Sequence, residues 1–450
     1  MAGLLEGIRV IDLSTIWAAP LGTRWLADMG AEVIKVQEVP RLTPAIIQRL
    51  RRLQEQRQQE TAAAAAGGGA ATAAPPRPAG LNPNQNPVMA EKGLTGYVLQ
   101  AEGNKKAVSL DFEKPRGREL LVRLIEMSDI VVDNHRPIVL ERIGLDFEGL
   151  TRIKPGIILL KVAAMGQTGP ERNYSGFGAT IDGLGGLAFH TGYHDVPDQP
   201  VRSGINYADP IAGMYVGSAL MMALLHRRRT GRGQEIDVSL RETLPIAEMF
   251  MEYSMNGRFF PRIGNREMGR APHGVYRCQG ADRWIAIAVN SDAEWRSLCA
   301  AMGDPEWAHA PEFADMHSRW RNHDALDARL NAWTSTQDDL ALAERLQAAG
   351  VAATPVLTPP EAVRSPHHQA RGWWHIMHQE HMGAYHYYGP GWRLSATPAR
   401  IHSPPPYHAQ HNREVLQGML GLSDAEYDQL LADQITSESA LPVLPPGDNP

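Results

Sequence analysis

Short apolar segments that alternate with amphipathic ones constrain the fold of this chain most. A β-branched segment at 7–14 precedes a helical stretch at 21–30, and a second predicted strand follows at 31–36. The order recurs from 108 to 162, where three more short apolar runs are separated by helical patterns. This alternation predicts a doubly wound, parallel, Rossmann-like α/β sheet.

Three predicted loops follow the carboxyl ends of these strands, at 14–20, 134–137 and 163–170. Ligands of open parallel sheets bind in the crevice at that edge. We therefore expect a binding site where these three loops meet.

The chain is too long for one ordinary core, so we expect more than one domain. The predicted parts are the first part of a large α/β domain at 1–225, a linker at 226–272, a small α+β domain at 273–357, and a segment at 358–450 that returns to the large domain. Residues 40–92 form a predicted flexible insert, because 62–78 is nearly all Ala, Gly and Pro and offers no apolar face.

Composition excludes several classes of protein. A net charge of −6 with mixed signs does not favour nucleic acid or an anionic membrane. The two cysteines, Cys278 and Cys299, form no C-x-x-C pair, which fits a reducing compartment. The N-terminus has no signal-peptide pattern and no long uncharged apolar run is apparent, so we expect a cytoplasmic protein without a membrane span.

One acidic residue has two interpretations. Asp209 precedes Pro210 and an apolar helical stretch at 211–225. That pattern is typical of a helix N-cap, where a carboxylate accepts hydrogen bonds from the first backbone N–H groups. The other interpretation, a catalytic nucleophile, comes from a resemblance to a known family.

Four segments in this order resemble the class III CoA-transferases, the CaiB/BaiF family. They are LEGIRVID at 5–12, MGAEVIKV at 29–36, DIVVDN at 129–134 and RTGRGQ at 229–234. The resemblance covers nearly the whole chain except about 40–92. It implies an enzyme that moves coenzyme A from an acyl-CoA donor to a carboxylic acid acceptor, with the coenzyme A thioester as substrate and no permanently bound cofactor or metal. It also implies an interlocked homodimer, or a heteromer with a related subunit.

The resemblance places the covalent nucleophile at Asp209, in the segment ADPIAG at 208–213. An aspartate suits this reaction because its carboxylate can attack a thioester, form a mixed anhydride, and then carry CoA as an aspartyl thioester. The energy of the thioester is thereby conserved, provided that water is excluded.

The resemblance also suggests residues that contact coenzyme A. These are Ile16, Trp17, Ala18, Arg41, Asn104, Lys105, Lys106, Asn134, His135, Arg136 and Arg142. Arg and Lys in such loops suit the phosphates. The chain departs from the family after the second strand, where Gln37 and Glu38 stand in place of a basic residue. Trp17 stands where the formyl-CoA transferase branch has glutamine, so we expect acids that are bulkier or less polar than formate and oxalate.

Two other functions compete with this interpretation. An α-methylacyl-CoA racemase of the same superfamily uses a histidine in a G-H-D segment, whereas this chain has Phe177 there, and phenylalanine cannot exchange a proton. A non-catalytic subunit would not need Asp209. The histidine-rich segment at 367–386 lacks a metal-binding spacing, and the basic run at 226–229 ends a predicted helix, which is a favourable place for cations.

Overall fold

The computed structural model describes residues 3–40, 92–196, 198–244, 247–380 and 382–440. Most of the predicted insert at 40–92, including Arg41, lies outside these ranges. The chain forms two compact units, which are described separately. The first comprises 1–185, 205–245 and 372–450, and the second comprises 186–204 and 246–371.

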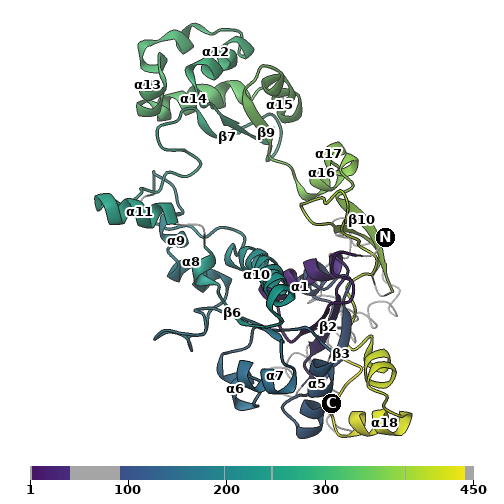
Figure 1. Cartoon of the computed structure of the whole chain (residues 1–450). Coiled ribbons are helices and arrows are strands. Elements are labelled where there is room, and N and C mark those ends of the chain that lie inside the picture. The colour runs from purple at the N-terminus through teal and green to yellow at the C-terminus, as the bar shows by residue number, and fades with distance from the viewer. Residues whose placement is uncertain (1–2, 41–91, 197, 245–246, 381, 441–450) are drawn as a thin grey trace, which may run out of the picture. The chain divides into compact units, whose positions relative to one another are not determined.

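A six-stranded, wholly parallel sheet forms the centre of the first unit (Figure 1). Its strands are β1 (Arg9–Asp12), β2 (Glu32–Gln37), β3 (Lys106–Ser109), β4 (Ile130–Asp133), β5 (Ile158–Ala163) and β6 (Glu235–Ser239). The spatial order is β3-β2-β1-β4-β5-β6, so the chain changes direction across the sheet between β1 and β4. This confirms the predicted doubly wound α/β fold of the sheet.

Helices cover both faces of this sheet. The helices of the first unit are α1 (Ala18–Asp28), α4 (Gly96–Ala101), α5 (Pro115–Glu126), α6 (Ile138–Arg142), α7 (Phe147–Ile153), α8 (Gly178–Leu184), α10 (Ala208–Thr230) and α18 (Asp424–Ala432), with a short 3-10 turn η1 (Arg241–Thr243) and a π-helical turn η4 (Arg413–Met419). One apolar cluster joins α1 and α10 to the sheet, and another joins α5, α7 and the C-terminal segment to the opposite face. A hairpin of β10 (Trp374–Gln379) and β11 (Gly383–Tyr388) completes the unit.

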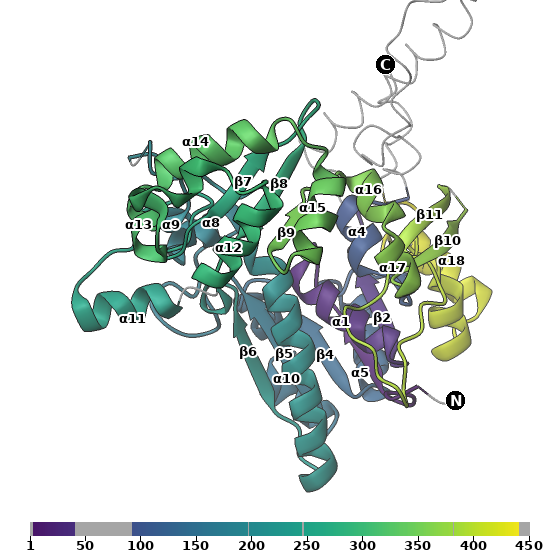
Figure 2. The same cartoon turned by 90° about the horizontal axis from the view of Figure 1, so that it is seen from above.

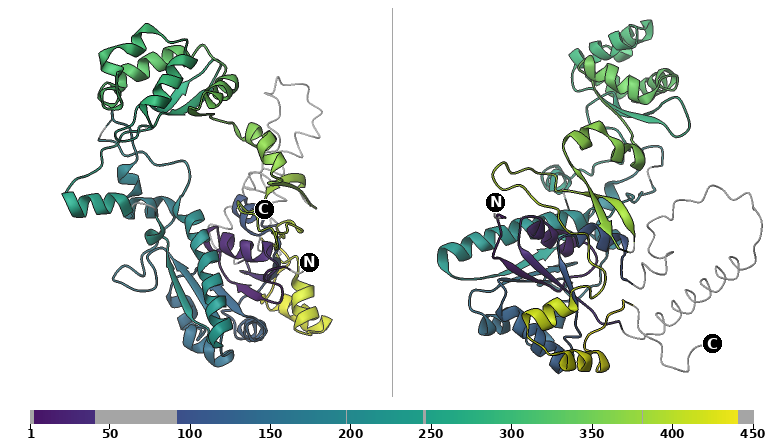
Figure 3. Two further views of the ribbon diagram at one scale, coloured as in Figure 1. Left: turned by 45° about the horizontal axis from the view of Figure 1, so that its top comes forward. Right: turned by 90° about the vertical axis from the view of Figure 1, so that its right-hand side faces the viewer.

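Helices α1 and α10 pack unusually closely because small residues face each other. A Cβ atom on Gly22 would lie 2.4 Å from a methyl carbon of Val216, so no larger residue fits there without displacement. Figures 2 and 3 show α10 beside α1, and α10 also contacts β5 and β6. By length and composition alone, helix α10 is apolar enough to cross a membrane, a test that a buried core helix also passes. Its buried face is part of the core of this unit.

The second unit is built on a three-stranded antiparallel sheet. Its elements are α9 (Leu187–His190), α11 (Ala247–Asn256), β7 (His273–Arg277), β8 (Trp284–Ala288), α12 (Asp292–Ala301), η2 (Glu306–His309), η3 (Pro311–Phe313), α13 (Met316–Arg321), α14 (His323–Thr334), α15 (Asp339–Ala348), β9 (Ala352–Pro355), α16 (Pro359–Arg364) and α17 (Pro366–Ala370). Strands β7 and β8 pair in antiparallel register and form a hairpin. Helices α12, α14 and α15 supply most of the helical side chains of one apolar core.

Strand β6 corrects one detail of the predicted organisation. The sequence predicts a linker at 226–272, but β6 lies within it and pairs with β5 as the edge of the parallel sheet. Only Val238 and Ser239 of this strand are buried. A half-exposed edge strand has no continuous apolar run, so its pattern resembles that of a connecting segment. The other predicted domain boundaries stay predictions.

Candidate active site

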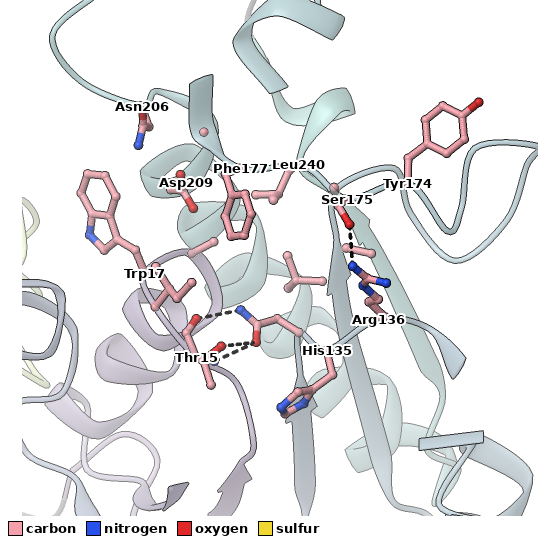
Figure 4. A pocket seen from close by; sticks show the side chains of 18 of the residues that line it. Thr15, Trp17, His135, Arg136, Tyr174, Ser175, Phe177, Asn206, Asp209 and Leu240 are labelled. Atoms are coloured by element: carbon pink, nitrogen blue, oxygen red, sulfur yellow. Dashed lines mark hydrogen bonds between the residues drawn. The ribbon is translucent and has the colours of Figure 1, made fainter. Parts of the chain in front are cut away.

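A cavity of about 540 Å³ opens at the carboxyl edge of the parallel sheet. The loops after β1 and β4 form part of its wall, so it lies where the strand order reverses, as expected for a ligand crevice in this fold. Figure 4 shows most of its lining side chains. The lining residues are Thr15 to Ala18, Tyr97, Asn134 to Pro137, Val162 to Ala164, Arg172, Tyr174 to Gly178, Asn206, Asp209 and Leu240.

Asp209 reaches this cavity from the first turn of α10 (Figure 4). The N-cap position of α10 is occupied by Tyr207, and no side chain caps the helix. The N-cap interpretation of Asp209 is therefore wrong: the helix begins at Ala208, so Asp209 already has a helical position inside the turn. Its carboxylate makes no hydrogen bond with any residue that the structure describes.

Burial and, to a smaller extent, the negative charge of Asp182 together raise the pKa of Asp209 to about 6. Asp182 lies on α8 and is almost fully buried. A carboxylate that has lost part of its hydration is a stronger nucleophile, and with this pKa it is still mostly ionised at neutral pH.

The loop between β1 and α1 forms one wall. Ile16 has a φ of 70°, a left-handed conformation that is strained for a β-branched residue, and half of its side chain is exposed. Trp17 packs against Tyr97 with a ring-centroid distance of 5.5 Å. Its indole nitrogen is buried without a hydrogen-bond partner among the described residues. Ala18 begins α1 and is buried.

The loop after β4 forms the facing wall. Asn134 bonds to the backbone of Thr15 and so joins the two loops. His135 is held by Asp133 and Glu38. Burial alone would lower the pKa of His135, but the hydrogen bonds and charges of these two carboxylates raise it to about 9. His135 is therefore a cation that its own neighbours neutralise.

Two arginines also line the cavity. Arg136 donates a hydrogen bond of 2.7 Å to the hydroxyl of Ser175, as Figure 4 shows. Arg172 forms an ion pair with Glu141 at 3.2 Å. The cavity therefore presents both charged and apolar surfaces near Asp209.

Several residues that the family resemblance suggested do not line this cavity. The Lys105 ammonium is fully buried and bonds to Glu102 at 2.6 Å and to Asp12 at 3.0 Å. The Asn104 amide bonds to Asp28 and to the backbone carbonyl of Arg400. The structure gives both side chains internal partners, and this geometry does not support a role for them in binding phosphate.

Lys106 and Arg142 also lie away from the cavity. Lys106 is the first residue of β3, at the amino edge of the sheet, and pairs with Glu32 and Glu414. Arg142 is exposed on α6 and pairs with Glu113 at 2.6 Å. Their proposed contacts with coenzyme A stay predictions, as does that of Arg41.

Some of the residues that line the cavity carry no signal in the sequence. Tyr97, Tyr174, Ser175, Asn206 and Leu240 lie in loops or short helices, where no periodic pattern marks them. The close approach of Asn206 to Gly178 appears only in the structure, where a Cβ atom on Gly178 would lie 2.2 Å from the Asn206 side chain. Among the described residues, no group of three or more His, Cys, Asp and Glu side chains is placed to hold a metal ion.

Comparisons with known proteins identify a matching family model and several similar proteins. The family model for CoA-transferase family III matches residues 5–66 and 77–412. A succinyl-CoA–D-citramalate CoA-transferase of Chloroflexus aurantiacus is 32% identical over 433 residues, covering 96% of this chain and 98% of that protein. The beta subunit of the succinyl-CoA–L-malate CoA-transferase of the same organism is 30% identical over 437 residues, covering 96% and 98%. The crystal structure of a CaiB/BaiF family protein from Brucella suis has a TM-score of 0.74 and 26% identity, covering 93% of this chain and all of that one.

Proposed function

The chain belongs to CoA-transferase family III, the CaiB/BaiF family, and from this premise we propose that it transfers coenzyme A between carboxylic acids through covalent intermediates on Asp209. The observation that carries the proposal is the state of Asp209. It lines the cavity at the switch point of the sheet, forms no hydrogen bond with a described residue, and has its pKa raised by burial.

The proposed reaction has four steps. A carboxylate oxygen of Asp209 attacks the thioester carbon of the donor. The carbon–sulfur bond breaks, the CoA thiolate departs, and a mixed anhydride between the donor acid and Asp209 is formed. The thiolate then attacks the aspartyl carbon and releases the donor as a free acid. The acceptor carboxylate attacks this aspartyl thioester and forms a second anhydride, again releasing the thiolate. Attack of the thiolate on the acceptor carbon yields the new acyl-CoA and restores the Asp209 carboxylate.

Exclusion of water is essential to this scheme because water would hydrolyse either intermediate. The apolar side chains of Trp17, Phe177 and Leu240 line the same cavity as Asp209 and support such exclusion. Desolvation of the carboxylate favours the same chemistry, since the acylated aspartate is neutral and the free aspartate is charged.

The isomerase alternative requires a second group that exchanges a proton with the substrate. Phe177 lines the cavity at the position that would hold such a histidine, so we propose transfer rather than isomerisation. A non-catalytic subunit is disfavoured by the exposure of Asp209 to the cavity.

The acids are proposed to carry two carboxyl groups. The relatives named above act on succinyl-CoA with citramalate or malate, which are all derivatives of dicarboxylic acids. Trp17 and Phe177 line the cavity with apolar surface, which suits the hydrocarbon chain between the two carboxyl groups of such an acid.

The assembly is proposed to be an interlocked homodimer in the cytoplasm, or a heteromer with a related subunit. Large apolar side chains are exposed on two helices of the described chain. They are Met214, Tyr215, Met222 and Leu225 on α10, and Phe250, Met251, Tyr253 and Met255 on α11. Exposed apolar surface of this extent is typical of protein interfaces. One relative is itself a subunit of a two-subunit enzyme.

The test is a transfer assay with the purified chain, succinyl-CoA and a panel of free acids, read by mass spectrometry of the acyl-CoA products. We expect new acyl-CoA without net loss of thioester, and no product with Asp209→Asn. Hydrolysis alone, or transfer by the Asn variant at a near-native rate, would contradict the proposal.

A further inference from the structure

Arg136 differs from the other cations of the cavity. His135 is bonded to Asp133 and Glu38, and Arg172 pairs with Glu141. Arg136 forms no ion pair with any described residue, and its described hydrogen bond goes to the neutral hydroxyl of Ser175. Arg136 is exposed to solvent, so its hydrated charge is accessible to an anionic ligand.

Arg136 and Asp209 approach the cavity from different elements. Asp209 comes from the first turn of α10, and Arg136 comes from the loop after β4. In Figure 4 the two side chains lie on opposite sides of Phe177. A molecule that bridges them thus needs an apolar centre, one end that reacts with a carboxylate nucleophile, and an anionic group at the other end.

We propose that Arg136, supported by Ser175, binds the second carboxylate of a dicarboxylic substrate while the first carboxyl group reacts at Asp209. The inference rests on the proposed function. It makes Arg136 a residue that determines specificity for diacids, in place of the contact with coenzyme A that the family resemblance suggests.

The chemistry of the guanidinium group supports this assignment. Its planar array of N–H donors matches a carboxylate with two parallel hydrogen bonds, and the bond to Ser175 fixes its orientation. The phosphates of coenzyme A offer similar oxygens. However, the whole pantetheine arm separates them from the reacting thioester, whereas the second carboxylate of a short diacid stays within the cavity that holds Asp209.

The experiment compares matched acids. Succinate and butyrate serve in turn as acceptors from acetyl-CoA, with the wild-type enzyme, Arg136→Gln, Arg136→Lys and a control variant, Arg152→Gln. Arg152 is an exposed residue of α7 that pairs with Glu148 and does not line the cavity. Thermal melting confirms that each variant is folded.

We expect Arg136→Gln to raise the KM for succinate at least about tenfold, because a charge-assisted pair is lost. The KM for butyrate, the kcat with butyrate and the KM for acetyl-CoA should stay unchanged, and Arg136→Lys should recover part of the preference for succinate. Arg152→Gln should behave as the wild type.

Two results would overturn the inference. One is an equal loss with succinate and butyrate. The other is a raised KM for acetyl-CoA that disappears when acetyl-pantetheine, which lacks the nucleotide, is the donor, since Arg136 would then serve the nucleotide phosphates. A wild-type enzyme that transfers CoA but prefers butyrate also contradicts the inference while the proposed function stands. Absence of transfer to any acid, with succinyl-CoA as well as with acetyl-CoA as the donor, contradicts the proposed function itself.

Discussion

The side-chain amide of Asn134 forms two reciprocal hydrogen bonds with the backbone of Thr15. Its Oδ1 atom accepts from the Thr15 N–H at 2.7 Å, and its Nδ2 atom donates to the Thr15 carbonyl at 2.8 Å. The side chain thus links the loops that follow β1 and β4 through a pair of hydrogen bonds like those between neighbouring β-strands. Because both loops line the cavity, this contact holds its two facing walls in register.

Replacement of Asn134 by Asp should separate these loops. The carboxylate keeps the acceptor but places a negative oxygen against the Thr15 carbonyl, so we expect a loss of about 1 to 2 kcal/mol in the free energy of unfolding and a fall in kcat/KM. Urea denaturation and transfer kinetics provide the measurements. Unchanged stability and kinetics would mean that the two loops are held by other contacts.

Replacement of Ile16 by glycine should have an unusual effect on stability. Its left-handed φ of 70° is strained for isoleucine and free of strain for glycine, and its exposed side chain loses little packing when removed. We expect Ile16→Gly to keep or increase stability, by up to about 1 kcal/mol.

The matched control is Ile138→Gly, since Ile138 is similarly exposed but lies in the helix α6. This variant should lose up to about 0.5 kcal/mol, because glycine disfavours a helix but Ile138 is only its first residue. Thermal melting measures both variants. Equal destabilisation would show that the Ile16 side chain contributes more to the free energy of unfolding than the strain of its left-handed backbone removes.

The fold was predictable from the sequence where the signals are periodic. The apolar runs of β1, β2, β4 and β5 and the helix that begins at Pro115 appear in the pattern because these elements are buried on one or both faces. The half-exposed strand β6 carries no such pattern. The insert could be recognised by composition, but its structure lies outside the described residues.

The site was only partly predictable, for a physical reason. Trp17, Asn134, Arg136 and Asp209 belong to segments that the family resemblance marks, and all four line the cavity. The same resemblance cannot distinguish a lysine that faces a ligand from one that neutralises buried carboxylates. Lys105 is of the second kind, since it pairs with Glu102 three residues before it and with Asp12 from a distant part of the chain. The pairing with Asp12 depends on tertiary structure and has no local signal.

Trp17 should influence which acids are accepted. It packs on Tyr97 at the cavity wall and presents a large apolar surface. Trp17→Gln should shift the ratio of kcat/KM values from bulkier acids toward oxalate and formate by about tenfold, the scale of one lost apolar contact. Competition assays with paired acids measure this ratio. An unchanged ratio would assign Trp17 to packing alone.

The protonation state of Asp209 should make both the activity and the stability of the protein depend on pH. Its pKa is about 6 in the folded protein, above the ordinary value of 3.8. Between these values the folded state binds a proton that the unfolded state has lost. The stabilisation is therefore fully present below the unfolded pKa and is lost as pH rises through the folded pKa.

Asp209→Asn should consequently be more stable than the wild type near about pH 8, where the wild type carries a partly desolvated charge. We expect about 1 kcal/mol after allowance for solvent screening, and no such gain below about pH 4. Transfer by the wild type should rise with pH through about 6. Melting curves of both proteins across this range test the point, and a gain that does not depend on pH would rule out this cause.

Covalent trapping tests the role of Asp209 most directly. The purified enzyme is incubated with an acyl-CoA and then treated with hydroxylamine or borohydride, and peptides are sequenced by mass spectrometry. The account predicts one modified peptide, with the hydroxamate or the alcohol on Asp209, and none in the Asp209→Asn variant. A label on another carboxylate, or full transfer activity without any label on Asp209, would contradict it.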